Sequence, residues 1–63
     1  MLEQAHLAEA FGELLAQQQK AAELCLELAK KADNPDLRQE LEQLGRDQRR
    51  HIELTKRLLE IVS

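Results

Sequence analysis

The sequence predicts an all-α protein in which two long helices form an antiparallel hairpin, and two hairpins form a four-helix bundle. The first observation is composition. The 63 residues are 43% hydrophobic but only 2% aromatic, and the abundant Leu, Ala, Glu, Gln, Lys and Arg are strong helix formers. The second is a single proline, Pro35, near the middle of the chain. The third is the recurrence of apolar residues at steps of four and three, which places them on one helix face.

The first helix is expected from about residue 2 to residue 32. Its predicted core stripe consists of Leu7, Phe11, Leu14, Gln18, Ala21, Cys25, Leu28 and Ala32. Lys30 and Lys31 fall in its last turn, where the negative end of the helix dipole favours cations.

The only turn signal is Asp33-Asn34-Pro35-Asp36, which predicts a turn over residues 33–35. Pro35 disfavours helical geometry at Asn34 and suits the first turn of a following helix. Asn34 or Asp33 is expected to cap that helix, with Asp36 near its positive end.

The second helix is expected from about residue 35 to residue 61, and residues 1–63 then make a single domain. Its predicted core stripe consists of Leu37, Leu41, Leu44, Gln48, His51, Thr55, Leu58 and Val62. Gly12 and Gly45 lie inside the two helices, and we expect a close approach between helices at both positions.

A chain of this size usually needs a partner to bury a sufficient core. Further apolar residues flank both stripes: Leu15, Leu24, Ile52, Leu54, Leu59 and Ile61. One partner helix cannot cover faces this wide, so the sequence predicts a homodimer. If two hairpins pack with their loops at opposite ends, both copies of Gln18, Gln48 and His51 converge at the bundle centre.

Gln18, Gln48 and His51 form a polar layer inside otherwise apolar stripes. A buried polar group costs about 1–3 kcal/mol unless it is hydrogen-bonded or bound to a ligand. One interpretation is a structural or protein-interaction module in which the layer sets register and dimer topology. The other is a ligand site. Asp47 is adjacent, but its helical spacing points it off the expected core face.

The chain also resembles one half of a ferritin-like, rubrerythrin-type protein. The resemblance rests on the stretch from Ala10 to Ala32 and on Gln48-Arg49-Arg50-His51. In that family one helix of each pair supplies a Glu and the other a Glu-x-x-His, and two pairs surround a di-iron centre. His51 matches the family histidine, whereas Gln18 and Gln48 stand where the two Glu belong.

The resemblance therefore implies a ferritin-like protein whose metal site, at His51, Gln48 and Gln18, is lost or altered. Neutral amides are poor ligands for a di-iron centre, so we expect no oxidase or peroxidase activity. Two His51 imidazoles could still hold one divalent ion such as Zn or Cu, or ligate a haem. No catalytic residue is assigned.

Other classes of function are disfavoured. Cys25 cannot close an intramolecular disulfide and is expected to be a small core residue. Arg46, Arg50 and Arg57 share a helix face, as in Rop-like RNA-binding hairpin dimers, but interleaved acids and the net charge of −3 favour a solvated face. No basic-then-apolar leader opens the chain, and no apolar stretch approaches the roughly 20 residues of a membrane span. The sequence predicts a cytoplasmic protein, or part of a larger one, without a membrane partner.

Overall fold

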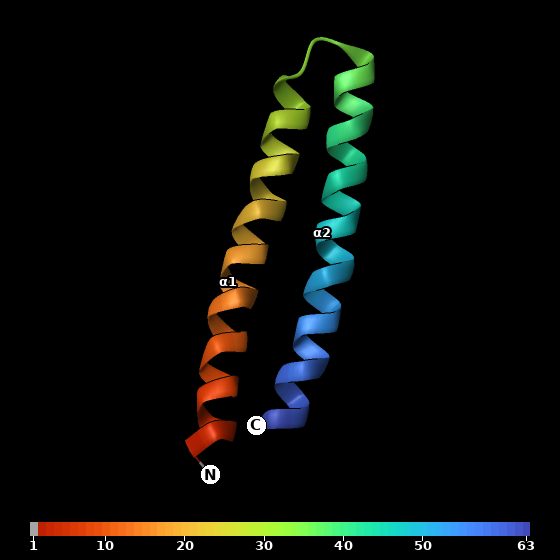
Figure 1. Ribbon diagram of the computed structural model, residues 1–63. Helices are drawn as coiled ribbons and strands as arrows, with labels where there is room; N and C mark the ends of the chain where they lie inside the picture. The colour runs from red at the N-terminus through yellow and green to blue at the C-terminus, as the bar shows by residue number, and fades with distance from the viewer. Residues whose placement is uncertain (1) are drawn as a thin grey trace.

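The computed structural model describes residues 2–63 and consists of two helices packed side by side (Figure 1). Helix α1 spans Leu2–Lys31 and helix α2 spans Pro35–Val62. The two helices run antiparallel, so the chain termini lie together at the end of the hairpin opposite the connection. The prediction of an all-α hairpin is confirmed, and each helix boundary falls within one residue of its expected position.

Asn34 caps the start of α2, as the sequence predicts. Its backbone is extended, with φ −84° and ψ 123°. Its side-chain Oδ1 accepts hydrogen bonds from the backbone N–H groups of Asp36 at 2.8 Å and Leu37 at 3.2 Å. Pro35 occupies the first turn, where its missing N–H leaves no bond unmade. The cap and the proline together fix where α2 begins.

The end of α1 is held by a residue from α2. The guanidinium Nη2 of Arg38 donates a hydrogen bond to the backbone carbonyl of Ala32 at 2.8 Å. Carbonyl groups at a helix end lack partners within the helix, so this bond satisfies one of them. The connection is therefore closed from both sides, and the first turn of α2 is fixed against the last turn of α1.

The seam between the helices contains the buried and half-buried residues at steps of four and three. On the α1 side the seam residues are Phe11, Leu15, Gln18, Ala22, Cys25, Ala29 and, directly after the helix, Ala32; in α2 they are Leu41, Gly45, Gln48, Ile52, Thr55, Leu59 and Val62. Every second residue of the predicted stripes is in this set. At the remaining steps the next residue along the chain takes the seam position, so Ala22 replaces Ala21 and Ile52 replaces His51.

Small side chains explain this displacement. Ala22, Cys25, Ala29 and Ala32 are all less than 9% exposed and make up most of the buried part of α1. The helices approach each other along these small residues, and the larger leucines one position earlier turn to the side. No large side chain among the described residues is fully buried. The hairpin on its own therefore has only a small core.

The two glycines differ in their surroundings. Gly45 is buried against α1, and a Cβ added there would lie 3.7 Å from the Cβ of Cys25, in ordinary van der Waals contact. The expected close approach is therefore present at Gly45. A Cβ added at Gly12 would meet no heavy atom within 4 Å. The expectation for Gly12 is wrong within the hairpin.

Candidate functional site: a polar mid-section and a one-sided apolar face

The polar residue Gln18 lies in the seam and is paired with Thr55. The Thr55 hydroxyl donates a hydrogen bond to Oε1 of Gln18 at 2.8 Å. Thr55 is 3% exposed and Gln18 is half-buried, so the bond is shielded from solvent competition. Both residues belong to the predicted core stripes, but the sequence did not predict the hydrogen bond between them. In the described chain no buried side-chain nitrogen or oxygen lacks a partner.

The three residues of the predicted polar layer have different environments. Gln18 is bonded to Thr55, Gln48 is half-buried in the seam, and His51 is exposed on the side of the hairpin. Among residues 2–63, no group of three or more His, Cys, Asp or Glu side chains is placed to hold a metal ion. A metal site that joins His51 to two or more further His, Cys, Asp or Glu ligands therefore needs a second molecule.

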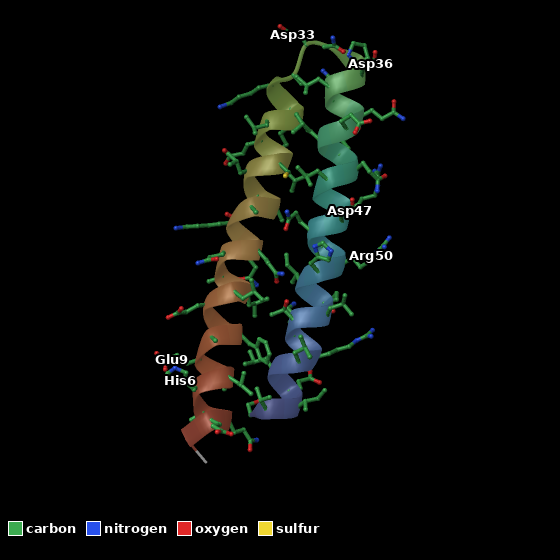
Figure 2. All side chains as sticks on the ribbon, viewed as in Figure 1. His6, Glu9, Asp33, Asp36, Asp47 and Arg50 are labelled. Atoms are coloured by element: carbon green, nitrogen blue, oxygen red, sulfur yellow. The ribbon has the colours of Figure 1, made fainter. Side chains whose placement is uncertain are left out.

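Asp47 is half-buried, although its helical spacing predicts a side chain directed away from the core face. Its Oδ1 accepts a hydrogen bond from Nε2 of Gln43 at 3.1 Å. Asp47 and Arg50 lie near the mid-length of the hairpin on α2 (Figure 2). Because the seam passes through Ile52 rather than His51, Asp47 and His51 share the side of α2 that flanks the seam. Their spacing of i, i+4 makes them neighbours on that surface.

Large apolar side chains that remain exposed gather on one side of the hairpin, which we call the apolar face. Its large residues are Leu7, Leu14, Leu24, Leu28, Leu37, Leu44, Leu54, Leu58 and Ile61, each at least 41% exposed. On both helices these positions lie about 30–150° round the axis from the mean direction of the seam residues, at 100° per residue and in the same rotational sense. Because the helices run antiparallel, that shared sense carries both sets to the same side of the hairpin.

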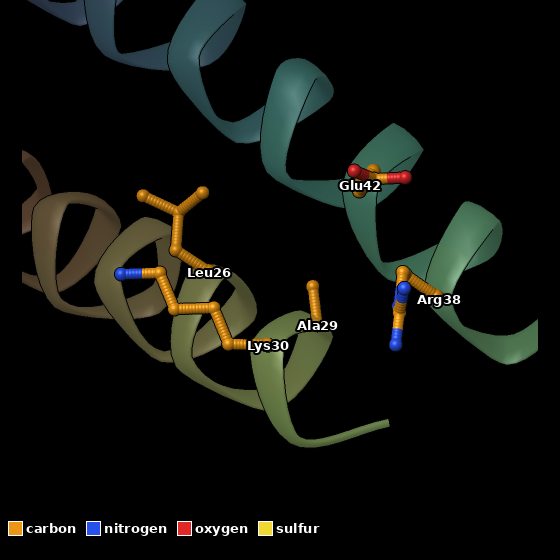
Figure 3. Close-up of a pocket in the computed structure, with 5 residues that line it drawn as sticks. All are labelled: Leu26, Ala29, Lys30, Arg38 and Glu42. Atoms are coloured by element: carbon orange, nitrogen blue, oxygen red, sulfur yellow. The ribbon is translucent and has the colours of Figure 1, made fainter. Parts of the chain in front are cut away.

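The opposite side of the hairpin is polar. Of the ten exposed large apolar residues that the structure describes, only Leu26 falls there. Its neighbours line a shallow groove near the connection, with Lys30 from α1 and Arg38 and Glu42 from α2 (Figure 3). Arg38 already donates to the Ala32 carbonyl, so the groove is a consequence of how the helix ends are joined.

The basic residues of α2 are interleaved with acids. Glu53 lies 3.7 Å from Lys56 in an i, i+3 ion pair, as the sequence predicts for this segment. Arg46 donates a hydrogen bond to Gln43. These contacts are typical of a solvated helix surface. Neither of the two described helices is long and apolar enough to cross a membrane.

Cys25 is buried against Gly45, which confirms its expected place in the core. Comparison with known proteins finds no matching family, no matching curated protein and no matching solved structure. The resemblance to a ferritin-like half-domain therefore stays a prediction. The geometry of the hairpin is the basis for assigning a function.

Proposed function

We propose that this chain is a self-association module, and that its apolar face packs against the same face of a second copy to form a four-helix bundle. The observation that carries this proposal is the placement, among the described side chains, of nine of the ten exposed large apolar ones on one side of the hairpin. Apolar surface gathered in this way marks an interaction site, whereas scattered apolar residues do not.

The exposed surface of the hairpin supports the need for a partner. The isolated chain of 7.3 kDa exposes 5185 Å², whereas a compact monomer of this mass exposes about 4200 Å². The hairpin is 50 Å long and 14 Å wide between Cα atoms, so one side presents about 700 Å². That area is close to the roughly 800 Å² per partner of a stable protein interface.

The order of residues along the apolar face favours a second copy with its loop at the opposite end. Residues level with each other across the hairpin have numbers that add to about 70, as in the pairs Cys25/Gly45 and Ala32/Arg38. The residues nearest the middle of the apolar face come from α1 and α2 in turn, and we call them the central line. Ordered by level from the open end of the hairpin to the connection, they are Leu7, Leu58, Leu14, His51, Ala21, Leu44, Leu28 and Leu37. The line has three leucines on each side of a His51–Ala21 centre. A two-fold axis through that centre places leucine on leucine throughout.

Charge along α1 favours the same arrangement. The first half of α1 contains Glu3, Glu9 and Glu13 and no lysine, whereas its second half contains three lysines and two acidic residues, Glu23 and Glu27. With the axis at the centre of the face, Glu9 of one copy is level with Lys31 of the other, whereas Glu13 is level with Glu27 and Lys20 with Lys20, so the argument rests on the net charge of each half and not on single pairs. A dimer with both loops at one end would bring the two acidic ends together. Such charges contribute little affinity, but they select orientation.

Sedimentation equilibrium of the metal-free protein tests the proposal. We expect a mass of about twice the 7.3 kDa chain at micromolar concentration. A helical monomer under these conditions would refute the proposal.

The orientation is tested by spin labels at the connection. Asp33 is exposed, so Asp33→Cys in a Cys25→Ala background gives one labelling site per chain. Loops at opposite ends separate the two labels by about the 50 Å length of the hairpin. Loops at one end would leave them within about 20 Å, because packed helices lie 8–10 Å apart. The shorter distance would refute the antiparallel arrangement and leave self-association intact.

A further inference from the structure

We infer that the centre of the dimer carries a site for one divalent transition-metal ion, formed by Asp47 and His51 from each of the two copies. The inference rests on the proposed function, because one hairpin supplies only half of the ligands. It follows from the displaced seam, which turns His51 onto the apolar face and leaves Asp47 beside it.

His51 is the only polar residue in the central line of the apolar face. The level residues on either side of it are Leu14 and Ala21. An imidazole in this position loses its contact with water when a second copy packs on the face, and it then needs a new partner. The adjacent Ala21 is the smallest residue of the line and leaves room for a ring or an ion.

Two-fold symmetry brings four ligands together. The axis passes α2 near residue 50, so His51 lies about 1.5 Å from it along the helix and Asp47 about 4.5 Å on the other side, at 1.5 Å per residue. The second copy repeats both positions in reverse. Along the bundle the order is then Asp47 of the first copy, His51 of the second copy, His51 of the first copy and Asp47 of the second copy. Each pair on one helix has the i, i+4 spacing by which helices chelate metal ions.

The ligand chemistry suits Zn²⁺, Co²⁺ or Ni²⁺. Two neutral imidazoles and two carboxylates give a four-coordinate set of nitrogen and oxygen ligands. The two carboxylates offset the two positive charges of the ion, so the loaded site carries no net charge in an apolar interface. Gln43, which already donates a hydrogen bond to Asp47, would orient the carboxylate as outer partners of metal ligands do. The site differs from one built on Gln18 and Gln48, because neither amide takes part.

The test is metal titration of the untagged, chelator-treated protein with Co²⁺ and Zn²⁺. We expect one ion per two chains, the visible absorption of four-coordinate Co²⁺, and a rise in melting temperature with Zn²⁺. His51→Leu should abolish all three. Asp47→Asn, which keeps the side-chain volume, should lose the Co²⁺ spectrum.

His6→Ala is the matched control, because His6 and Glu9 are the other histidine and carboxylate that share a helix face (Figure 2). This variant should bind metal as the wild type does. No bound ion at 100 μM metal, a stoichiometry of one ion per chain, or loss of binding in His6→Ala would each overturn the inference. Sedimentation in chelator is independent of these results. A dimer without metal binding refutes the site alone, whereas a monomer in both conditions refutes the proposed function as well.

Discussion

Replacing single leucines on the two sides of the hairpin tests the assignment of the apolar face. Leu14, on the apolar face, and Leu26, on the opposite side, are both in α1 and are 41% and 42% exposed. Neither residue is one of the seam residues, both are covered to the same extent within the hairpin, and alanine has high helix propensity. The two variants therefore differ in one respect, which is the side of the molecule that they change.

The expected effect follows from the remaining exposure. Full burial of a leucine contributes about 1.5–3 kcal/mol, so covering the exposed 41% of Leu14 contributes about 0.6–1.2 kcal/mol per copy. A homodimer loses this twice, about 1.2–2.4 kcal/mol for Leu14→Ala. At 1.4 kcal/mol per tenfold, the dimer dissociation constant should rise about 7- to 50-fold. Leu26→Ala should change it less than twofold.

Sedimentation equilibrium over a dilution series measures both constants, with circular dichroism as the check that both variants remain helical. Equal dissociation constants for the two variants would refute the assignment of the face. A larger effect of Leu26→Ala would place the interface on the opposite side.

Three further predictions concern the seam, the cap and the basic residues of α2. Thr55→Val leaves the half-buried Gln18 amide without its partner and should lower the unfolding free energy, measured by chemical denaturation, by about 1–2 kcal/mol. Adding Gln18→Leu should recover most of this loss, since an apolar pair then replaces a broken polar one. If the double variant is no more stable than Thr55→Val, the broken Gln18–Thr55 hydrogen bond is not the cause of the lost stability. Asn34→Ala removes both cap bonds and should cost about 1 kcal/mol, or about 4–8 °C in melting temperature, whereas Asn34→Gly should cost only a few tenths; an unchanged melting temperature in Asn34→Ala would rule out the cap. RNA titrated at low salt should form no submicromolar complex, and a tight complex that weakens steeply with salt would show that Arg46 and Arg50 bind phosphates.

The connection was predictable from sequence because its chemistry is local. Asn34 and Pro35 act on their own backbone and on the next few residues, so no distant contact can change their effect. The same is true of the helix boundaries, which the hydrogen bonds of Asn34 confirm. Steps of four and three were equally sufficient to identify two helices that pack together.

The seam was predictable only in part, because the apolar side of each helix is broader than the strip that packs against the other helix of the hairpin. A 4/3 spacing starting from Leu7 selects Leu14 and Leu28, whereas the seam contains Leu15 and Ala29. Both choices are apolar, and periodicity alone cannot say which one meets the partner helix of the hairpin. The signal that could have decided it is size. The small residues Ala22, Cys25 and Ala29, together with Gly45 opposite, mark the line along which two helices joined by a short connection approach most closely.

The displaced seam also separates the polar mid-section into two parts with different roles. The Gln18–Thr55 bond lies inside the hairpin, where it penalises any sliding of α1 against α2, since a slip by one turn would leave both groups buried without a partner. His51 lies on the apolar face, and in the proposed dimer it would penalise sliding of one hairpin against the other, since other registers set its imidazole against leucine. One polar group therefore acts within the hairpin, and the other would act in the proposed dimer. A ferritin-like core would instead require Gln18, Gln48 and His51 to converge, and in this hairpin Gln18 is already bonded to Thr55. Carboxylates at positions 18 and 48 would have to compete with that bond before they could hold iron.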